Sequence, residues 1–240
     1  ARQLTNLPAQ LTRFIGRERE IADVRRLLGE SRQLTLVGSG GAGKTRLSQR
    51  VAAEMLPLFP DGVWFVALAA LTDPSLLADT TARSLGLSLS SRSPQDVLID
   101  HLRNREALIV LDNCEHLVDG CAELAERLLG ACPHLCLLAT SREALNNAGE
   151  VTWFMPAMES DDAVELFVER AGAAQPGYSL ADADRVKVRE LCSQLDGMPL
   201  AIELAAARLR VMSLDDILSH LNDRMKLLAG GPRTAMPRQQ

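Results

Sequence analysis

The sequence predicts an α/β protein: a three-layer domain built on a mainly parallel five-stranded sheet, followed by a small helical subdomain. Between residues 33 and 156, short apolar runs alternate with amphipathic segments, the pattern of βαβ units whose sheet is covered on both faces. After Pro156 the periodicity is helical only. The chain has 240 residues, of which 47% are hydrophobic and 24% charged, enough for one large domain or a domain with an appendage.

Five short apolar runs are the predicted strands. A run of this length that is bounded by turn residues is typical of a strand buried within a sheet. The expected strands are QLTLVG (33–38), GVWFVAL (62–68), ALIVLDN (107–113), HLCLLATSR (134–142) and EVTWFMP (150–156).

Helices are predicted between these strands. Residues 44–56 carry apolar residues at helical spacing and end before Pro57. Residues 74–86 have proline early and glycine late, the usual helix asymmetry. In residues 93–102, Ser93 is the expected cap and Pro94 the first helical residue. Residues 117–133 form an amphipathic helical pattern.

The second part of the chain is predicted to be helical throughout. Helices are expected at residues 160–172, 182–197, 199–211 and 213–223, and Ser160 and Ser213 resemble helix starts. The predicted domains are therefore 1–155 and 156–223. The final stretch, AGGPRTAMPRQQ, is typical of a linker, so residues 224–240 are assigned to one.

The composition disfavours several classes of protein. No run of 18 apolar residues and no secretory leader occurs, and a net charge of −5 argues against a nucleic-acid-binding surface. Five cysteines, an odd number, favour reduced thiols and a cytoplasmic location. A zinc site at Cys132, His134 and Cys136 is disfavoured, because Cys136 lies in an apolar strand and no paired C-x-x-C occurs. Because the chain begins at Ala1 rather than Met, we expect a piece of a longer protein.

A glycine-rich loop lies between the first predicted strand and the first predicted helix. Residues 38–45, GSGGAGKT, match the pattern G-x-x-x-x-G-K-[ST] in full. Glycines let main-chain N–H groups surround phosphate oxygens at a helix N-terminus, whose dipole favours an anion. Lys44 would neutralise the β- and γ-phosphates, and Thr45 would offer its hydroxyl to Mg²⁺. The alternative is a glycine-rich turn that only precedes a helix. The predicted nucleotide contacts here are Gly40, Gly41, Ala42, Gly43, Lys44, Thr45 and Arg46.

A carboxylate follows the third predicted strand. The apolar run LIVL (108–111) ends in Asp112, which at this edge of a parallel sheet could reach the metal ion held by Thr45. An Asp that only starts a turn is the alternative. Hydrolysis also needs a group that activates water. Asn113 cannot accept a proton in that role, so Glu115 is the first candidate and His116 a weaker one.

An arginine follows the fourth predicted strand. In a sheet of order 5-1-4-3-2, this strand lies between those that carry Gly38 and Asp112. Arg142 would then point towards the γ-phosphate and detect it, and a solvated surface arginine is the alternative. The predicted catalytic set is Lys44, Asp112, Glu115 and Arg142, with Thr45 and Asp112 as the Mg²⁺ ligands.

Taken together, these motifs resemble the STAND class of P-loop NTPases, which includes NB-ARC modules. The resemblance is closest to the ATPase module of bacterial AfsR- and LuxR-like transcriptional regulators, and it covers nearly the whole chain. The segments that carry it are residues 6–20, 36–47, 61–77, 108–117, 137–143 and 195–210, in which FIGRE and GMPLA flank the phosphate loop.

The resemblance implies contacts to the base of a nucleotide. In the family, the segment that matches Phe14, Ile15, Gly16 and Arg17 lies against adenine, and the proline that matches Pro199, followed by Leu200, packs on the base or sugar. A helix start and nothing more is the alternative for Pro199. The family continues into a winged-helix domain, so residues 224–240 would lead towards a domain that lies outside this sequence.

The resemblance implies an ATP/ADP-binding regulatory switch with slow Mg²⁺-dependent hydrolysis. Its expected partners are an adenine nucleotide and the other domains of a parent protein, with no direct nucleic-acid or membrane contact. Whether the chain forms a nucleotide-dependent homo-oligomer is left undecided by the sequence. No N-K-x-D guanine motif occurs, so GTP is disfavoured. The alternatives are a P-loop ATPase with independent turnover and a nucleotide-binding scaffold without turnover.

Overall fold

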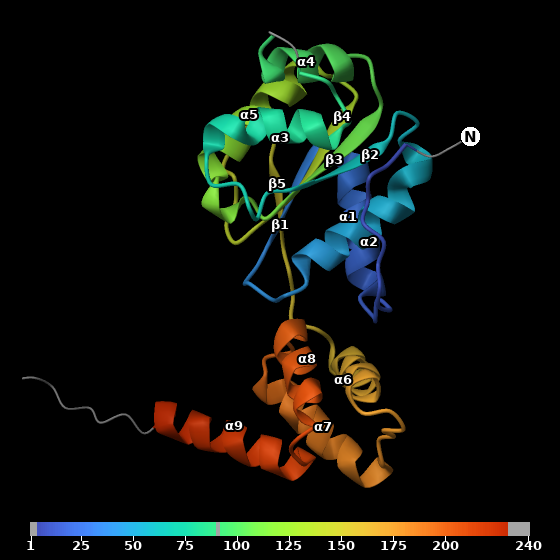
Figure 1. Cartoon of the computed structure of the whole chain (residues 1–240), viewed down its shortest axis with the longest axis vertical. Helices are drawn as coiled ribbons and strands as arrows, with labels where there is room; N and C mark the ends of the chain where they lie inside the picture. The colour runs from blue at the N-terminus through green and yellow to red at the C-terminus, as the bar shows by residue number, and fades with distance from the viewer. Residues whose placement is uncertain (1–3, 90–91, 230–240) are drawn as a thin grey trace, which may run out of the picture. The chain divides into compact units, whose positions relative to one another are not determined.

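The structure is a computed structural model that describes residues 4–89 and 92–229, with side chains described up to residue 223. The chain divides into two compact units, Ala1–Pro156 and Ala157–Gln240. The first unit contains the sheet and the second contains helices (Figure 1).

The first unit is built on five parallel strands. They are β1 (Gln33–Val37), β2 (Val63–Ala67), β3 (Ala107–Asp112), β4 (Leu135–Ser141) and β5 (Val151–Phe154). The order across the sheet is β2-β3-β4-β1-β5, which confirms the predicted order 5-1-4-3-2. β4 pairs with both β1 and β3 in parallel, so the ends of these three strands meet at one edge of the sheet.

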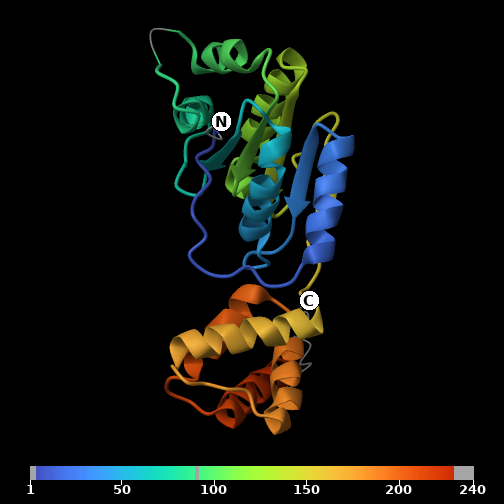
Figure 2. The same ribbon diagram turned by 90° about the vertical axis from the view of Figure 1, so that its right-hand side faces the viewer.

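Helices cover both faces of this sheet, as Figure 2 shows. On one face α1 (Glu18–Glu30) and α2 (Lys44–Met55) pack on Leu34, Leu108 and Val110. On the other face lie α3 (Leu77–Ser84), α4 (Pro94–Leu102) and α5 (Val118–Ala131), which pack on Ile109 and Leu137. Successive strand residues alternate between the two cores, as the period of a β-strand requires. Three short 3₁₀ helices, η1 (Leu56–Leu58), η2 (Pro74–Leu76) and η3 (Cys114–His116), complete the described part of this unit.

Two helices of the first unit differ from the sequence prediction. The first helix, α1, was not predicted, although it buries Ile21, Val24 and Leu28 at helical spacing. The predicted helix at residues 74–86 is divided into η2 and α3. Asp73 accepts a hydrogen bond from the N–H of Ser75 and so favours a tight first turn.

The segment before α1 covers the outer edge of the sheet. β2 is an edge strand, and the carbonyl of Leu4 accepts a hydrogen bond from the N–H of Val63 at 3.0 Å. The side-chain amide of Asn6 then bonds both main-chain groups of Phe65, with its oxygen 2.6 Å from the nitrogen and its nitrogen 2.9 Å from the carbonyl oxygen. Asn6 thus pairs with the edge strand much as a neighbouring strand would.

The second unit is a bundle of four helices within the described residues. They are α6 (Ser160–Ala174), α7 (Asp182–Gln194), α8 (Pro199–Arg208) and α9 (Leu214–Ala229). α6 packs on α7 and α8, and Phe167 of α6 is fully buried. Ser213 and Asp216 form a reciprocal capping pair before α9, which confirms the predicted helix start.

The assigned linker began too early. α9 continues through Ala229, so residues 224–229 belong to a helix. Sequence explains the difference, because Met225, Lys226, Leu227 and Leu228 favour helix and the first glycine is Gly230. Residues 230–240 of that assignment lie outside the described residues.

All five cysteines lie in the described part of the chain and are free thiols. Burial raises the pKa of Cys192, in α7, to about 11. The described residues contain no group of three or more histidine, cysteine, aspartate and glutamate side chains that could bind a metal ion.

Candidate functional site

The phosphate loop lies between β1 and α2. Its residues run from Gly38 to Gly43, and α2 begins at Lys44. Gly43, the residue before the helix, has φ 95°, a left-handed conformation that favours glycine. A β-carbon at Gly38 would lie 2.9 Å from Cβ of Met155, so that position has no room for a side chain. The sequence therefore gives a main-chain cradle that leads directly into a helix N-terminus.

Lys44 lies over this loop. Its Nζ donates hydrogen bonds to the carbonyl oxygens of Gly38 at 2.7 Å and Ser39 at 3.0 Å. Burial lowers the pKa of Lys44, and the charge of Glu115 acts in the opposite direction. Arg142 and Asp112 also act on the pKa of Lys44, which brings the four predicted catalytic residues into one electrostatic neighbourhood.

Asp112 joins the phosphate loop to the middle of the sheet. Its Oδ1 accepts hydrogen bonds from the hydroxyl of Thr45 and from the hydroxyl of Thr140, both at 2.7 Å. Asp112 and Thr140 are buried, whereas Thr45 is exposed. A hydroxyl beside a carboxylate is an oxygen-only donor set of the kind that Mg²⁺ prefers, so the two predicted metal ligands fit that ion.

Thr140 is a site residue that was not predicted from the sequence. It is the sixth residue of β4 and has an exposed fraction of only 1%, and its Oγ1 also accepts the N–H of Asn113 at 2.9 Å. The signal was a hydroxyl residue within an otherwise apolar strand, next to the strand that carries Asp112. Only the register between β3 and β4 shows that the two side chains meet.

Both ring nitrogens of His116 form hydrogen bonds. Its Nε2 lies 3.1 Å from the carbonyl oxygen of Leu68 and 2.7 Å from that of Leu71, so Nε2 carries the proton and donates. Its Nδ1 then accepts from the side-chain amide of Asn113 at 3.3 Å. These contacts fix the turn that follows β3 and give His116 a structural task.

Glu115 and Arg142 form an ion pair. Nε of Arg142 lies 3.2 Å from Oε1 of Glu115, and the two side chains have exposed fractions of 66% and 17%. The second oxygen of Glu115, Oε2, is buried and has no hydrogen-bond partner within the part of the chain that the structure describes. Glu115 therefore offers one carboxylate oxygen to Arg142 and retains one unused acceptor.

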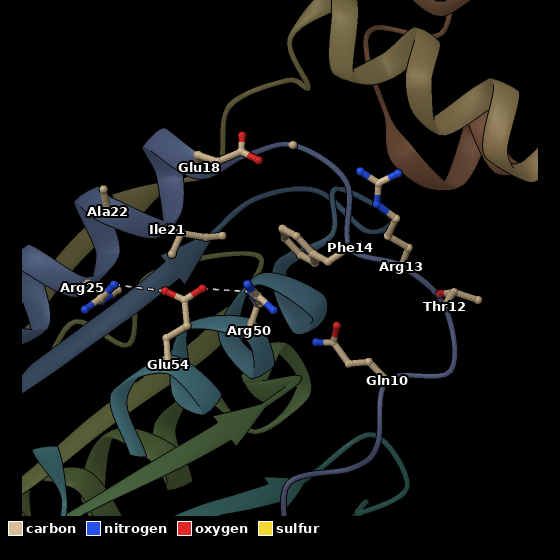
Figure 3. A pocket seen from close by; sticks show the side chains of 11 residues that line it. Gln10, Thr12, Arg13, Phe14, Glu18, Ile21, Ala22, Arg25, Arg50 and Glu54 are labelled. Atoms are coloured by element: carbon tan, nitrogen blue, oxygen red, sulfur yellow. Dashed lines mark hydrogen bonds and ion pairs between the residues drawn. The ribbon is translucent and has the colours of Figure 1, made fainter. Parts of the chain in front are cut away.

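Residues 14–17, the segment predicted to contact the base, differ in their burial. Ile15 and Arg17 are buried, whereas Phe14 is half-buried and lines a cavity of about 500 Å³ with residues of α1 and α2. Figure 3 shows the Phe14 ring on this cavity, with Glu54 between Arg25 and Arg50.

Arg17 connects this segment to the phosphate loop. Its backbone has φ 65°, and its guanidinium donates to the carbonyl oxygens of Ala42 and Pro156, each at 3.3 Å. It also pairs with Glu20 at 3.3 Å. Arg46, the other predicted contact with a charged side chain, donates to the carbonyl oxygens of Thr12 and Arg13 at 3.2 and 2.9 Å. Two predicted nucleotide contacts thus also hold the segment before α1 in place.

Pro199 and Leu200 lie in the second unit. Pro199 is the first residue of α8, as predicted, and Leu200 is half exposed, with an exposed fraction of 50%. Gly197, just before them, has φ 59°, and a β-carbon there would lie 2.9 Å from the carbonyl oxygen of Met158. This tight turn fixes the start of α8 within the second unit.

The loop, Lys44 and the Thr45–Asp112 pair are the features of a P-loop NTPase. In a comparison with protein families, residues 27–144 match the model of the AAA domain. The chain thus carries an AAA-type P-loop NTPase module, and such modules bind nucleotides at this loop.

Among curated proteins, the chain is 50% identical over 219 residues to a Mycobacterium tuberculosis protein named as an HTH-type transcriptional regulator. That match covers 90% of this chain and 25% of the relative. A second, uncharacterized protein of the same species is 43% identical over 232 residues, with 96% of this chain and 59% of the relative covered. The chain therefore spans about a quarter of the length of one relative and somewhat over half of the other.

Among solved structures, the fold resembles a STAND protein of Pyrococcus horikoshii that has a tetratricopeptide repeat sensor. The TM-score is 0.57 at 16% identity, over 91% of this chain and 33% of the other. At this identity the likeness concerns the fold. Within the described residues, no helix has both the length and the apolar character needed to cross a membrane.

Proposed function

We propose that this chain is the ATP/ADP-binding switch module of a longer regulatory protein, with slow Mg²⁺-dependent ATP hydrolysis. The observation that supports this best is the state of Glu115, the first candidate for activating water. Its Oε1 is held by Arg142 at 3.2 Å, and the residue after Asp112 is Asn113, which is not a base. A site with this arrangement is equipped to bind phosphates and poorly equipped to turn over.

In this proposal the residues of the loop bind and orient the phosphates. Main-chain N–H groups of residues 40–43 and of the N-terminus of α2 would donate hydrogen bonds to the anion, and Lys44 would balance its charge. Thr45 and Asp112 would hold Mg²⁺, which when bound supplies charge neutralisation at the β- and γ-phosphates. Thr140 keeps the Asp112 carboxylate oriented through its 2.7 Å hydrogen bond.

The base would be recognised at the segment 14–17 and, from the second unit, by Pro199 and Leu200. Phe14 supports this assignment because it presents an aromatic ring at a cavity, a surface suited to a flat base. A nucleotide that binds two conformations of the protein with different affinities can shift their equilibrium by that difference in affinity. The relatives suggest a transcriptional regulator as the parent protein.

A second candidate function is an ATPase with independent turnover. Oε2 of Glu115 favours it, because this buried oxygen is an unused acceptor beside the phosphate loop. A carboxylate oxygen in that position could orient a water molecule if the other oxygen were released by Arg142.

Two measurements on the purified chain test the proposal. Thermal unfolding with ADP, ATP or GTP should show stabilisation by the adenine nucleotides and little by GTP. Phosphate release under multiple turnover should be far slower than the 1 s⁻¹ at the low end of typical turnover numbers. Fast turnover without a partner would support the second candidate, and no stabilisation by any nucleotide would refute both.

A further inference from the structure

Arg142 and Glu115 come from adjacent strands of the sheet. Arg142 directly follows β4, which ends at Ser141, and Glu115 lies in η3, three residues after the end of β3. Because β3 and β4 are parallel neighbours, the two side chains leave the same edge of the sheet. Their ion pair, with 3.2 Å between Nε of Arg142 and Oε1 of Glu115, lies at that edge of the sheet.

The guanidinium also approaches the phosphate loop. A β-carbon built on Gly40 would lie 3.4 Å from Nη2 of Arg142. Arg142 therefore has Glu115 on its Nε side and the phosphate loop on its Nη2 side. An arginine has five N–H donors in one plane, and a phosphoryl group offers it a more highly charged acceptor than a carboxylate does.

The two partners differ in exposure. Arg142 is two-thirds exposed, so its side chain can rearrange at little cost, whereas Glu115 is largely buried beside Lys44. An added terminal phosphoryl group would be anionic like Glu115, and at the phosphate loop it would come within reach of the same guanidinium. A nucleotide with this extra group must compete for Arg142, and a nucleotide without it leaves the pair undisturbed.

We propose that Glu115 is a specificity-determining residue that lowers the affinity for ATP relative to ADP by holding Arg142 in an ion pair. ADP binds with the pair intact. ATP binds only by drawing Arg142 away, and this releases Oε1 of Glu115 at the same time. The inference rests on the proposed function, since it assumes that adenine nucleotides bind at the phosphate loop. Beyond that function, the Glu115 carboxylate would lower the affinity for ATP in the resting state.

Glu115→Gln tests this most directly, because it keeps the shape of the side chain and removes the charge that holds Arg142. The probes are ADP and a non-hydrolysable ATP analogue, each with Mg²⁺, measured by calorimetry. The ratio of the analogue affinity to the ADP affinity should rise about three- to tenfold, since an ion pair of this kind is worth a factor of that order. Glu143→Gln is the matched control, because Glu143 is exposed and adjacent in sequence to Arg142. In this control, the ratio of the analogue affinity to the ADP affinity should equal that of the unmodified chain.

A double-mutant cycle supplies a second readout, which needs no enzymatic activity. Glu115→Gln, Arg142→Gln and the double variant are unfolded thermally at saturating ADP and at saturating analogue. Coupling between the two positions should be present with ADP and absent with the analogue. Equal coupling in both states would show that the pair is only structural and would overturn the inference.

The outcomes separate this inference from the proposed function. If both nucleotides bind and the affinity ratio of Glu115→Gln matches that of Glu143→Gln, the proposed function survives and the inference fails. If neither nucleotide binds the unmodified chain, both fail together.

Discussion

Thr140 holds Asp112 by a hydrogen bond of 2.7 Å between its hydroxyl and Oδ1 of the carboxylate. The same hydroxyl accepts the N–H of Asn113 at 2.9 Å, so one buried side chain fixes both the carboxylate and the turn that follows it. Because Thr45, at the start of α2, donates to the same Oδ1, the helix α2 and the strands β3 and β4 are joined at a single oxygen atom. The candidate metal site is thus organised by the sheet as well as by the loop.

Thr140→Val should destabilise the first unit by about 1–3 kcal/mol, because it removes two hydrogen bonds and leaves the N–H of Asn113 without its acceptor. It should also weaken the binding of ATP with Mg²⁺. Chemical unfolding and calorimetry measure the two effects. Thr140→Ser keeps the hydroxyl and should retain most of the affinity. Similar losses for valine and serine would exclude the hydroxyl as the cause.

Lys44→Ala should abolish the stabilisation of the chain by nucleotide. With ligand at about 100 times its Kd, the unmodified chain gains roughly 2.7 kcal/mol, and thermal unfolding detects this as a shift of Tm. Lys187→Ala is the control. It removes a lysine that pairs with Asp184 and Asp215 in the second unit, and its shift should be that of the unmodified chain. An undiminished shift in Lys44→Ala would contradict the assignment of the phosphate site.

Removal of Mg²⁺ should weaken ATP binding more than ADP binding, because the ion would neutralise charge on both the β- and γ-phosphates and ADP lacks the second of these. Titration of each nucleotide with and without a chelator gives the two ratios. In Asp112→Asn the chelator should have much less effect. If the chelator reduced both affinities equally in the unmodified chain, Thr45 and Asp112 would not act as a metal pair.

Cys192 should make the stability of the second unit depend on alkaline pH. Burial raises its pKa to about 11, above the 9.0 expected in the unfolded chain. In the native state the thiol keeps its proton, while the unfolded state loses it, so stability falls as the pH rises from about 9 to 11. Two pKa units correspond to about 2.7 kcal/mol at most. The slope of Tm against pH should be shallower in Cys192→Ala, and an identical slope would rule out this thiol.

The sheet was predictable because each strand carries its own local signal. The runs at residues 33–38 and 107–113 are apolar along their length, and the glycine loop fixes which strand precedes α2. The helix α1 was not predicted because Glu18, Arg19, Glu20 and further charged residues dominate its composition and obscure three buried positions. The last helix, α9, is longer than predicted. Its residues 224–229 precede the glycine- and proline-rich tail and contain neither glycine nor proline.

The site could be predicted only where residue type and spacing define the chemistry. Lys44, Thr45 and Asp112 belong to a pattern whose geometry the strand–loop–helix context sets. Thr140 has no such pattern, since a threonine in a buried strand is common and its partner depends on strand register. The ion pair of Glu115 with Arg142 depends on how two loops leave neighbouring strands, which the sequence does not specify.

The contact of Asn6 with Phe65 has a consequence for the outermost strand. An uncovered strand at the border of a sheet can recruit a strand from another molecule and start aggregation. Asn6 occupies both main-chain groups of Phe65 with its own amide, so the segment before α1 works as a guard against such self-association. Trimming the protein to the family-matched region that begins at residue 27 would remove this segment together with most of α1.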